Sequence, residues 1–156
     1  MHAKKHLKCT EPKIGWQWLS SISLPETLED FGDNDVREIG RRGGKSGLWV
    51  QDGWALGYIG TAPAEVTIPD GVKGIAAYAF EGQYDLERVV LPESLKFIGK
   101  DAFAGCTSLE GLDLPEGCGR IDDRAFRDCT WIQEVALASG LTNIGAAALA
   151  NCAGLS

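Results

Sequence analysis

Apolar residues recur along the second half of the chain with a period of 23 residues. The unit is clearest in residues 89–111, VVLPESLKFIGKDAFAGCTSLEG, and further copies occupy 66–88, 112–134 and 135–156. Each copy has aliphatic residues in its first third, an Ala-Phe pair near its middle (Ala-Leu in the last copy) and an aliphatic residue near its end. A fixed period of this length predicts a solenoid, in which each coil buries its apolar side by stacking on its neighbours.

The junction between two units carries the pattern L-x-x-L-x-L, as in Leu109, Leu112 and Leu114. Because alternate strand residues point to opposite faces, these three side chains should point inward and the residues between them outward. A proline, such as Pro115, follows in three of the four units; it has no N–H and so ends the hydrogen-bonded ladder. The pattern therefore predicts a parallel ladder of short strands, and a second extended stretch at residues 96–98 predicts an opposite wall.

The rest of the unit, with proline after the strand and then LKFIGKDAFAGCTSL, resembles the BspA-type leucine-rich repeat of bacterial and protozoal surface proteins. The resemblance implies a leucine-rich-repeat solenoid that is mostly β, with the strand ladder on its concave face and short helical or 3₁₀ turns at DAFAGC. It also implies a non-enzymatic module for protein recognition or adhesion, at the cell surface or secreted.

The first half of the chain is expected to cap this solenoid. Residues 1–14 are basic and read as a disordered tail. Within residues 15–65, WQWLSSISLPETLEDFG reads as a degenerate first coil whose two Trp residues cover the end of the stack. A polar, Gly-rich insertion follows, and Asp52-Gly53 between apolar runs predicts a β-hairpin that leads into the first repeat.

The Gly-rich insertion contains two sequences that resemble ligand loops. Residues 40–46, GRRGGKS, are one residue short of a phosphate-binding P-loop and lack the strand and helix that would frame it. Asp33 and Asp35 suggest a calcium loop, but the downstream glycine and glutamate ligands are absent. We therefore expect a solvated turn, with neither a cofactor nor a metal.

The charge balance restricts the class of partner. The chain has a net charge of −7, and residues 66–156 hold 13 acidic and 7 basic residues, so the repeats carry −6 of it. This acidity argues against nucleic acid and against anionic membrane surfaces. No apolar run approaches the roughly 20 residues that span a bilayer, and the start has no secretory signal, so the sequence leaves the compartment open.

Five cysteines are too few for a disulfide scaffold. Cys106, Cys129 and Cys152 share one repeat position and should form a column of buried thiols, with an inter-repeat disulfide or a metal column as the alternative. Cys118 replaces an aliphatic core residue, whereas Cys9 lies in the tail and is the expected reactive or intermolecular thiol.

Nothing in the sequence indicates an enzyme. Both histidines lie in the tail, so no Ser-His-Asp or Cys-His arrangement can form on the repeats. Asp122 and Asp123 are adjacent, but their repeat position reads as a surface turn. We expect no catalytic residues.

The outward positions of the strands predict a partner surface. They form an acidic stripe with one arginine, which suits a basic protein surface, although the charge could instead serve only solubility. Trp131 replaces polar residues of the other copies, so it is either an exposed binding anchor or a cap on the last coil. The candidate binding residues are Glu87, Arg88, Val90, Glu110, Asp113, Trp131, Gln133 and Glu134, and the remaining outward positions are Glu65, Thr67, Gly111 and Ala136.

The last coil should expose an apolar stack edge formed by Val135, Leu137, Leu141 and Ile144. Such edges invite pairing with another chain. This supports a second hypothesis, in which the protein is a homo-oligomer assembled edge to edge, or a fragment of a longer repeat array.

Overall fold

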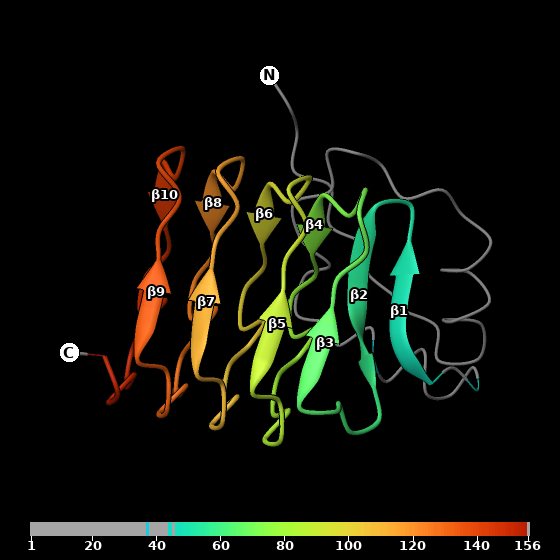
Figure 1. The fold of residues 1–156 in the computed structure, drawn as a ribbon, viewed down its shortest axis with the longest axis horizontal. Coiled ribbons are helices and arrows are strands. Elements are labelled where there is room, and N and C mark those ends of the chain that lie inside the picture. Colours follow the sequence, from blue (N-terminus) through green and yellow to red (C-terminus); the bar gives the residue numbers. More distant parts are fainter. Residues whose placement is uncertain (1–36, 38–43, 45, 156) are drawn as a thin grey trace.

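Short coils stack side by side into a solenoid (Figure 1). The computed structural model describes residues 37, 44 and 46–155. We name the two walls from the view in Figure 1: β3, β5, β7 and β9 form the front wall, and β4, β6, β8 and β10 form the back wall. The described strands are β1 (Gly47–Gln51), β2 (Trp54–Ile59), β3 (Glu65–Thr67), β4 (Gly74–Ile75), β5 (Arg88–Val90), β6 (Phe97–Ile98), β7 (Gly111–Asp113), β8 (Arg120–Ile121), β9 (Glu134–Ala136) and β10 (Asn143–Ile144).

The back wall belongs to one six-stranded sheet in the order β1-β2-β4-β6-β8-β10. Its four repeat strands are parallel and pair across one full repeat, as in Ile75 with Ile98 and Ile98 with Ile121. The predicted hairpin extends this sheet, because β2 is antiparallel to β1 and parallel to β4. Asp52 and Gly53 have φ values of 50° and 80°, the two positive values that a type I′ turn requires.

The front wall consists of two parallel pairs, β3 with β5 and β7 with β9. The central residue of β3, β5 and β7 is buried, and that of β9 in the last coil is half-buried, while the flanking residues are exposed except for half-buried Gly111. This alternation follows from the period of two along a strand. β5 and β7 belong to separate sheets, and the Glu110 amide donates to the Glu87 carbonyl (3.0 Å) at this boundary.

The core lies between the walls and repeats with the sequence. Leu109, Leu112 and Leu114 are 0%, 3% and 8% exposed, which confirms their predicted inward direction. Phe80, Phe103 and Phe126 form a column of stacked rings, with centroids 5.0 and 5.2 Å apart and planes within 5° of parallel. The repeated phenylalanine therefore buries its ring against the equivalent rings of the neighbouring coils.

Each coil turns the corner after its back-wall strand with a residue in the left-handed region. Tyr78, Asp101, Arg124 and Ala147 occupy the same repeat position, with φ between 52° and 61°. Four residues later a second left-handed position follows, held by Gly82, Gly105, Asp128 and Asn151. These left-handed residues interrupt any regular helix, so the DAFAGC segment consists of separate i to i+3 turns. The Ala104 amide donates to the Asp101 carbonyl, and the Cys106 amide donates to the Phe103 carbonyl.

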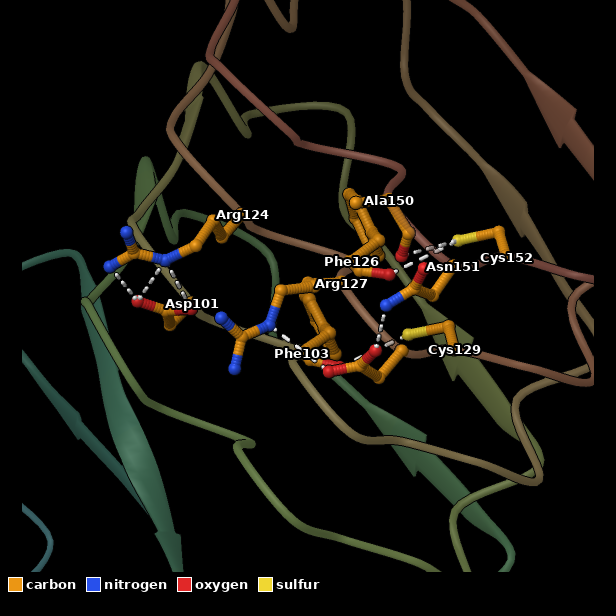
Figure 2. A network of polar contacts seen from close by, with 10 residues as sticks. Asp101, Phe103, Arg124, Phe126, Arg127, Cys129, Ala150, Asn151 and Cys152 are labelled. Carbon is orange, nitrogen blue, oxygen red and sulfur yellow. Dashed lines mark hydrogen bonds and ion pairs between the residues drawn. The ribbon is translucent and has the colours of Figure 1, made fainter.

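Polar contacts between neighbouring coils accompany the apolar core (Figure 2). Asp101 is 4% exposed, and Arg124 of the next coil binds its carboxylate through Nη2 (2.8 Å) and Nε (3.1 Å). The hydrogen bond with Asp101 also raises the pKa of Arg124. On the same side, Asn151 donates to Asp128 at 2.7 Å. A buried carboxylate needs such a partner, so the pair fixes the register of two coils.

Several predicted features lie outside the described residues. These are the basic tail with Cys9, the degenerate first coil with Trp16 and Trp18, the aspartates Asp33 and Asp35, and most of residues 40–46. Within the part of the chain that the structure describes, no helix has the length and apolar character needed to cross a membrane.

Replacing the central ring of the phenylalanine column tests how much the stack contributes. We expect Phe103→Ala to lower the free energy of unfolding by about 3–5 kcal/mol, because it leaves a cavity between two neighbouring rings. Phe103→Leu should cost less, since Leu149 occupies this position in the last coil. Urea denaturation measures both, and a loss below about 1 kcal/mol for the alanine variant would contradict this role.

Two adjacent, exposed alanines test the left-handed corner position. Ala147 has a φ of 56°, whereas Ala146 is not among the residues with positive φ. Ala147→Gly should therefore raise the free energy of unfolding by about 1 kcal/mol by relieving contact between Cβ and the carbonyl. Ala146→Gly is the control and should lower it by about 0.4–1 kcal/mol, because glycine adds entropy to the unfolded chain. Equal effects of the two substitutions would rule out the strain.

Candidate protein-binding surface

The outward side chains of the front wall form its solvent face. Among the predicted outward positions the acids are Glu65, Glu87, Glu110, Asp113 and Glu134, while Arg88 supplies the single base, which gives this face a net charge of −4. Arg88 lies 3.8 Å from the Glu65 carboxylate, and the two side chains are 66% and 57% exposed. An ion pair this exposed adds little stability, so Arg88 remains free to meet a partner.

A groove of about 560 Å³ crosses this face over β5, β7 and β9. It lies over the boundary between β5 and β7, where the front-wall ladder is interrupted. Gly111 leaves the first outward position of the middle strand without a side chain, and Val90 is an apolar side chain that is 44% exposed. The structure places seven of the eight candidate binding residues along this groove, namely Glu87, Arg88, Val90, Glu110, Asp113, Gln133 and Glu134.

Trp131 is the candidate that the structure does not bring to the groove. Its side chain is 58% exposed on the turn before β9, and it is not among the groove-lining residues. Gly154 packs against its backbone, because a Cβ on Gly154 would lie 3.1 Å from the Trp131 carbonyl oxygen. We call the side formed by residues 78–85 and their equivalents in later coils the turn side of the solenoid. Trp131, the equivalent of Asp85, is therefore an exposed aromatic on the turn side, apart from the acidic groove.

Glu93 also lines the groove, although the sequence analysis did not select it. It follows the proline that ends its strand, and Asp70 and Glu116 hold the equivalent positions in the adjacent coils. All three are exposed. The sequence does show an acidic residue directly after the proline in three units. The outward residues were selected by the alternation along each strand, and this position lies beyond the end of the strand.

A second hollow, of about 690 Å³, lies on the turn side next to β2. Its charged residues are largely paired with each other: Arg37 with Glu81 at 3.2 Å and Arg127 with Asp128 at 3.0 Å. Tyr84, 65% exposed, stands at its rim. Asp85 is the remaining carboxylate, so the lining residues of the hollow have a net charge of −1, whereas those of the groove have a net charge of −4.

The predicted stack edge is partly exposed. Leu137 and Ile144 are 52% and 51% exposed, whereas Val135 and Leu141 are half-buried. Self-association through these four residues stays a prediction.

The cysteine column is built into the core as free thiols. Cys106, Cys129 and Cys152 each donate from Sγ to the carbonyl of the phenylalanine in the preceding coil, at 3.1–3.2 Å. Figure 2 shows the contacts of Cys129 and Cys152. Burial raises the pKa of Cys106 to about 12 and also raises the pKa values of Cys129 and Cys152. Thiols held in the neutral form are poor nucleophiles and poor metal ligands.

Gln83 replaces cysteine in this column and joins the hairpin to the repeats. Its side chain is buried, accepts from the Ala62 amide at 2.8 Å and donates to the Gly60 carbonyl at 2.9 Å. The longer side chain reaches the connection between β2 and β3, whose polar backbone groups would otherwise lose their partners.

The adjacent carboxylates of Asp122 and Asp123 both have structural partners. Arg120 binds Asp122 at 3.2 Å, and the Ala146 amide donates to Asp123 at 2.8 Å. Within the described residues, no cluster of three or more His, Cys, Asp or Glu side chains could hold a metal ion.

Comparison with known proteins agrees with this geometry. The family profile described as the BspA-type leucine-rich repeat region (6 copies) matches residues 59–156. The chain belongs to the BspA-type leucine-rich repeat family. A comparison with curated proteins finds no match.

Three solved structures of bacterial leucine-rich repeat proteins resemble this BspA-type chain. The T. pallidum leucine-rich repeat protein is 29% identical over 64% of this chain and 59% of its own, with a TM-score of 0.56. A Bacteroides ovatus leucine-rich repeat protein is 26% identical over 59% and 36%, with a TM-score of 0.51. A leucine-rich cell surface protein of Faecalibacterium prausnitzii is 25% identical over 86% and 30%, with a TM-score of 0.58. This chain therefore spans 30–59% of the length of these relatives.

The thiol column predicts a graded reactivity. In a Cys9→Ser variant of the BspA-type chain at about pH 8, Ellman's reagent should modify half-buried Cys152 first and reach Cys106, Cys118 and Cys129 only on unfolding. Because the folded state holds these thiols neutral, their contribution to stability should be constant below about pH 8 and fall as pH rises toward 12, where only the unfolded thiols ionise. Mass spectrometry identifies the modified cysteine, and labelling of Cys106 as fast as Cys152 would contradict the arrangement.

Proposed function

We propose that this BspA-type repeat chain is a non-enzymatic recognition module that binds a basic surface of a partner protein in its front-wall groove. The observation that carries the proposal is the coincidence of the acidic face with a groove of about 560 Å³ that has an exposed valine among its lining residues. Carboxylates around the groove attract a basic partner and speed its approach, while Val90 and the bare backbone at Gly111 give contact area at close range.

The setting we propose for this recognition is the cell surface. One of the structural relatives is described as a leucine-rich cell surface protein. The family resemblance adds adhesion as the use of the groove, with a protein of a host or of a neighbouring cell as the partner.

A selection from a random peptide display library tests the proposal without a known partner. Peptides retained by the wild-type chain should be enriched in Lys and Arg, and added salt should lower their affinity for the chain. Glu110→Lys should reduce their affinity about tenfold or more, because it places a positive charge in the groove. Asp85→Lys makes the same charge change on the exposed turn away from the groove and should leave the affinity within about twofold.

The two substitutions separate recognition in the groove from general attraction to an acidic protein. Equal losses for Glu110→Lys and Asp85→Lys would mean that only net charge is sensed. No loss in either variant would place the binding surface elsewhere. Both outcomes would overturn the proposed function.

A further inference from the structure

Carboxylates flank the groove in two lines that run along the solenoid axis. The first line is formed by Glu87 and Glu110, one repeat apart and immediately before the front-wall strands. The second is formed by Asp70, Glu93 and Glu116, one repeat apart and just after the prolines. All five are exposed, and Glu116 also accepts hydrogen bonds from the Ser139 amide and hydroxyl. Because the back-wall strands of all four coils pair and the Glu110 amide donates to the Glu87 carbonyl, neighbouring coils, and with them successive carboxylates of a line, are spaced by about 4.8 Å.

The outward residues of β5, β7 and β9 form the floor between the two lines. Val90 and Gly111 give this floor a low, apolar part, and Arg88, Asp113 and Glu134 are its charged residues. Val90 lies there at 44% exposure. On the next coil Gly111 has no side chain, and a Cβ there would stand only 3.3 Å from the Glu134 carbonyl oxygen. A partner backbone can therefore approach closely at Gly111, while basic side chains of the partner reach the exposed carboxylates around it.

The spacing of the coils discriminates between the conformations that a bound segment could take along this axis. Side chains on one face of an extended strand recur every ~6.7 Å, so they fall out of step with carboxylates spaced by ~4.8 Å after a single coil. An α-helix repeats every ~5.4 Å and drifts by only about 1 Å over two coils, which flexible Lys and Arg side chains absorb. A helix also presents two flanks and a central stripe, whereas a strand presents two opposite faces.

We propose that the groove takes an amphipathic α-helix of the partner protein, laid along the solenoid axis across β5, β7 and β9. Lys and Arg on the two flanks of the helix face the two lines of carboxylates, and a small apolar stripe packs on Val90 and Gly111. Further basic side chains of the helix meet Asp113 and Glu134 on the floor. The inference rests on the proposed function, because it assigns a conformation and a residue pattern to the segment that the groove recognises.

Two synthetic peptides of identical composition test this pattern. Both have about 16 residues of Lys, Leu and Ala, long enough to form a helix. One places Leu in a stripe of helical period with Lys on both flanks, and the other alternates Lys and Leu with the period of a strand. The two peptides have the same charge, so a difference between their affinities reports the effect of the peptide's conformation and of its apolar pattern. Fluorescence anisotropy gives the Kd values, and circular dichroism gives the helix content on binding.

We expect the helical peptide to bind about tenfold more tightly than its isomer and to gain helix content when bound. Val90→Asp should remove most of this preference, and Thr107→Asp on the exposed turn should preserve it. Glu93→Lys should weaken the helical peptide more than Asp85→Lys does, because only Glu93 lines the groove.

Equal affinities for the two peptides, both lowered by Glu93→Lys, would overturn the helix and leave the groove as a binding site for basic protein segments in general. The absence of binding by either peptide would also overturn the helix. The display selection tests the proposed function separately, because it imposes no helical pattern on the ligand.

Discussion

The contact of each coil with the next is the constraint on which the rest of the structure depends. A single coil has too few residues to enclose a core, so its inward side chains are buried only when an equivalent coil lies on each side. The phenylalanine column shows the geometry of this contact, with rings about 5 Å apart and nearly parallel. This spacing matches the distance between paired strands, so ring stacking and backbone ladders favour the same arrangement.

Because the coils stack in register, any residue type that recurs at one repeat position forms a column along the solenoid. Cysteines one repeat apart donate to equivalent carbonyls, and Asp101 meets Arg124 because they hold the same position in successive coils. The acidic groove arises in the same way. Inward positions of the front wall are committed to the core, while outward positions are free to vary, and here they accumulate carboxylates around an exposed valine.

The sequence predicts most of the fold because the period, the inward alternation and the Asp-Gly turn are local patterns with physical meanings. It does not predict the left-handed corner residues, since Tyr78, Asp101, Arg124 and Ala147 share no chemistry that marks such a backbone. The surface was predicted less completely. Strand alternation finds Glu110 and Asp113, but Glu93 lies beyond the proline where alternation ends, and Trp131 lies on a turn whose direction depends on that same corner.

Mapping backbone amide chemical shifts of the isotope-labelled chain, as a basic peptide from the display selection is added, tests the central claim most directly. The account predicts shifts grouped in residues 87–91, 93, 110–114 and 133–134, which line the groove, with the back wall and the turn around Tyr84 unchanged. Shifts grouped at the hollow beside Tyr84, or on the last coil at Leu137 and Ile144, would contradict it.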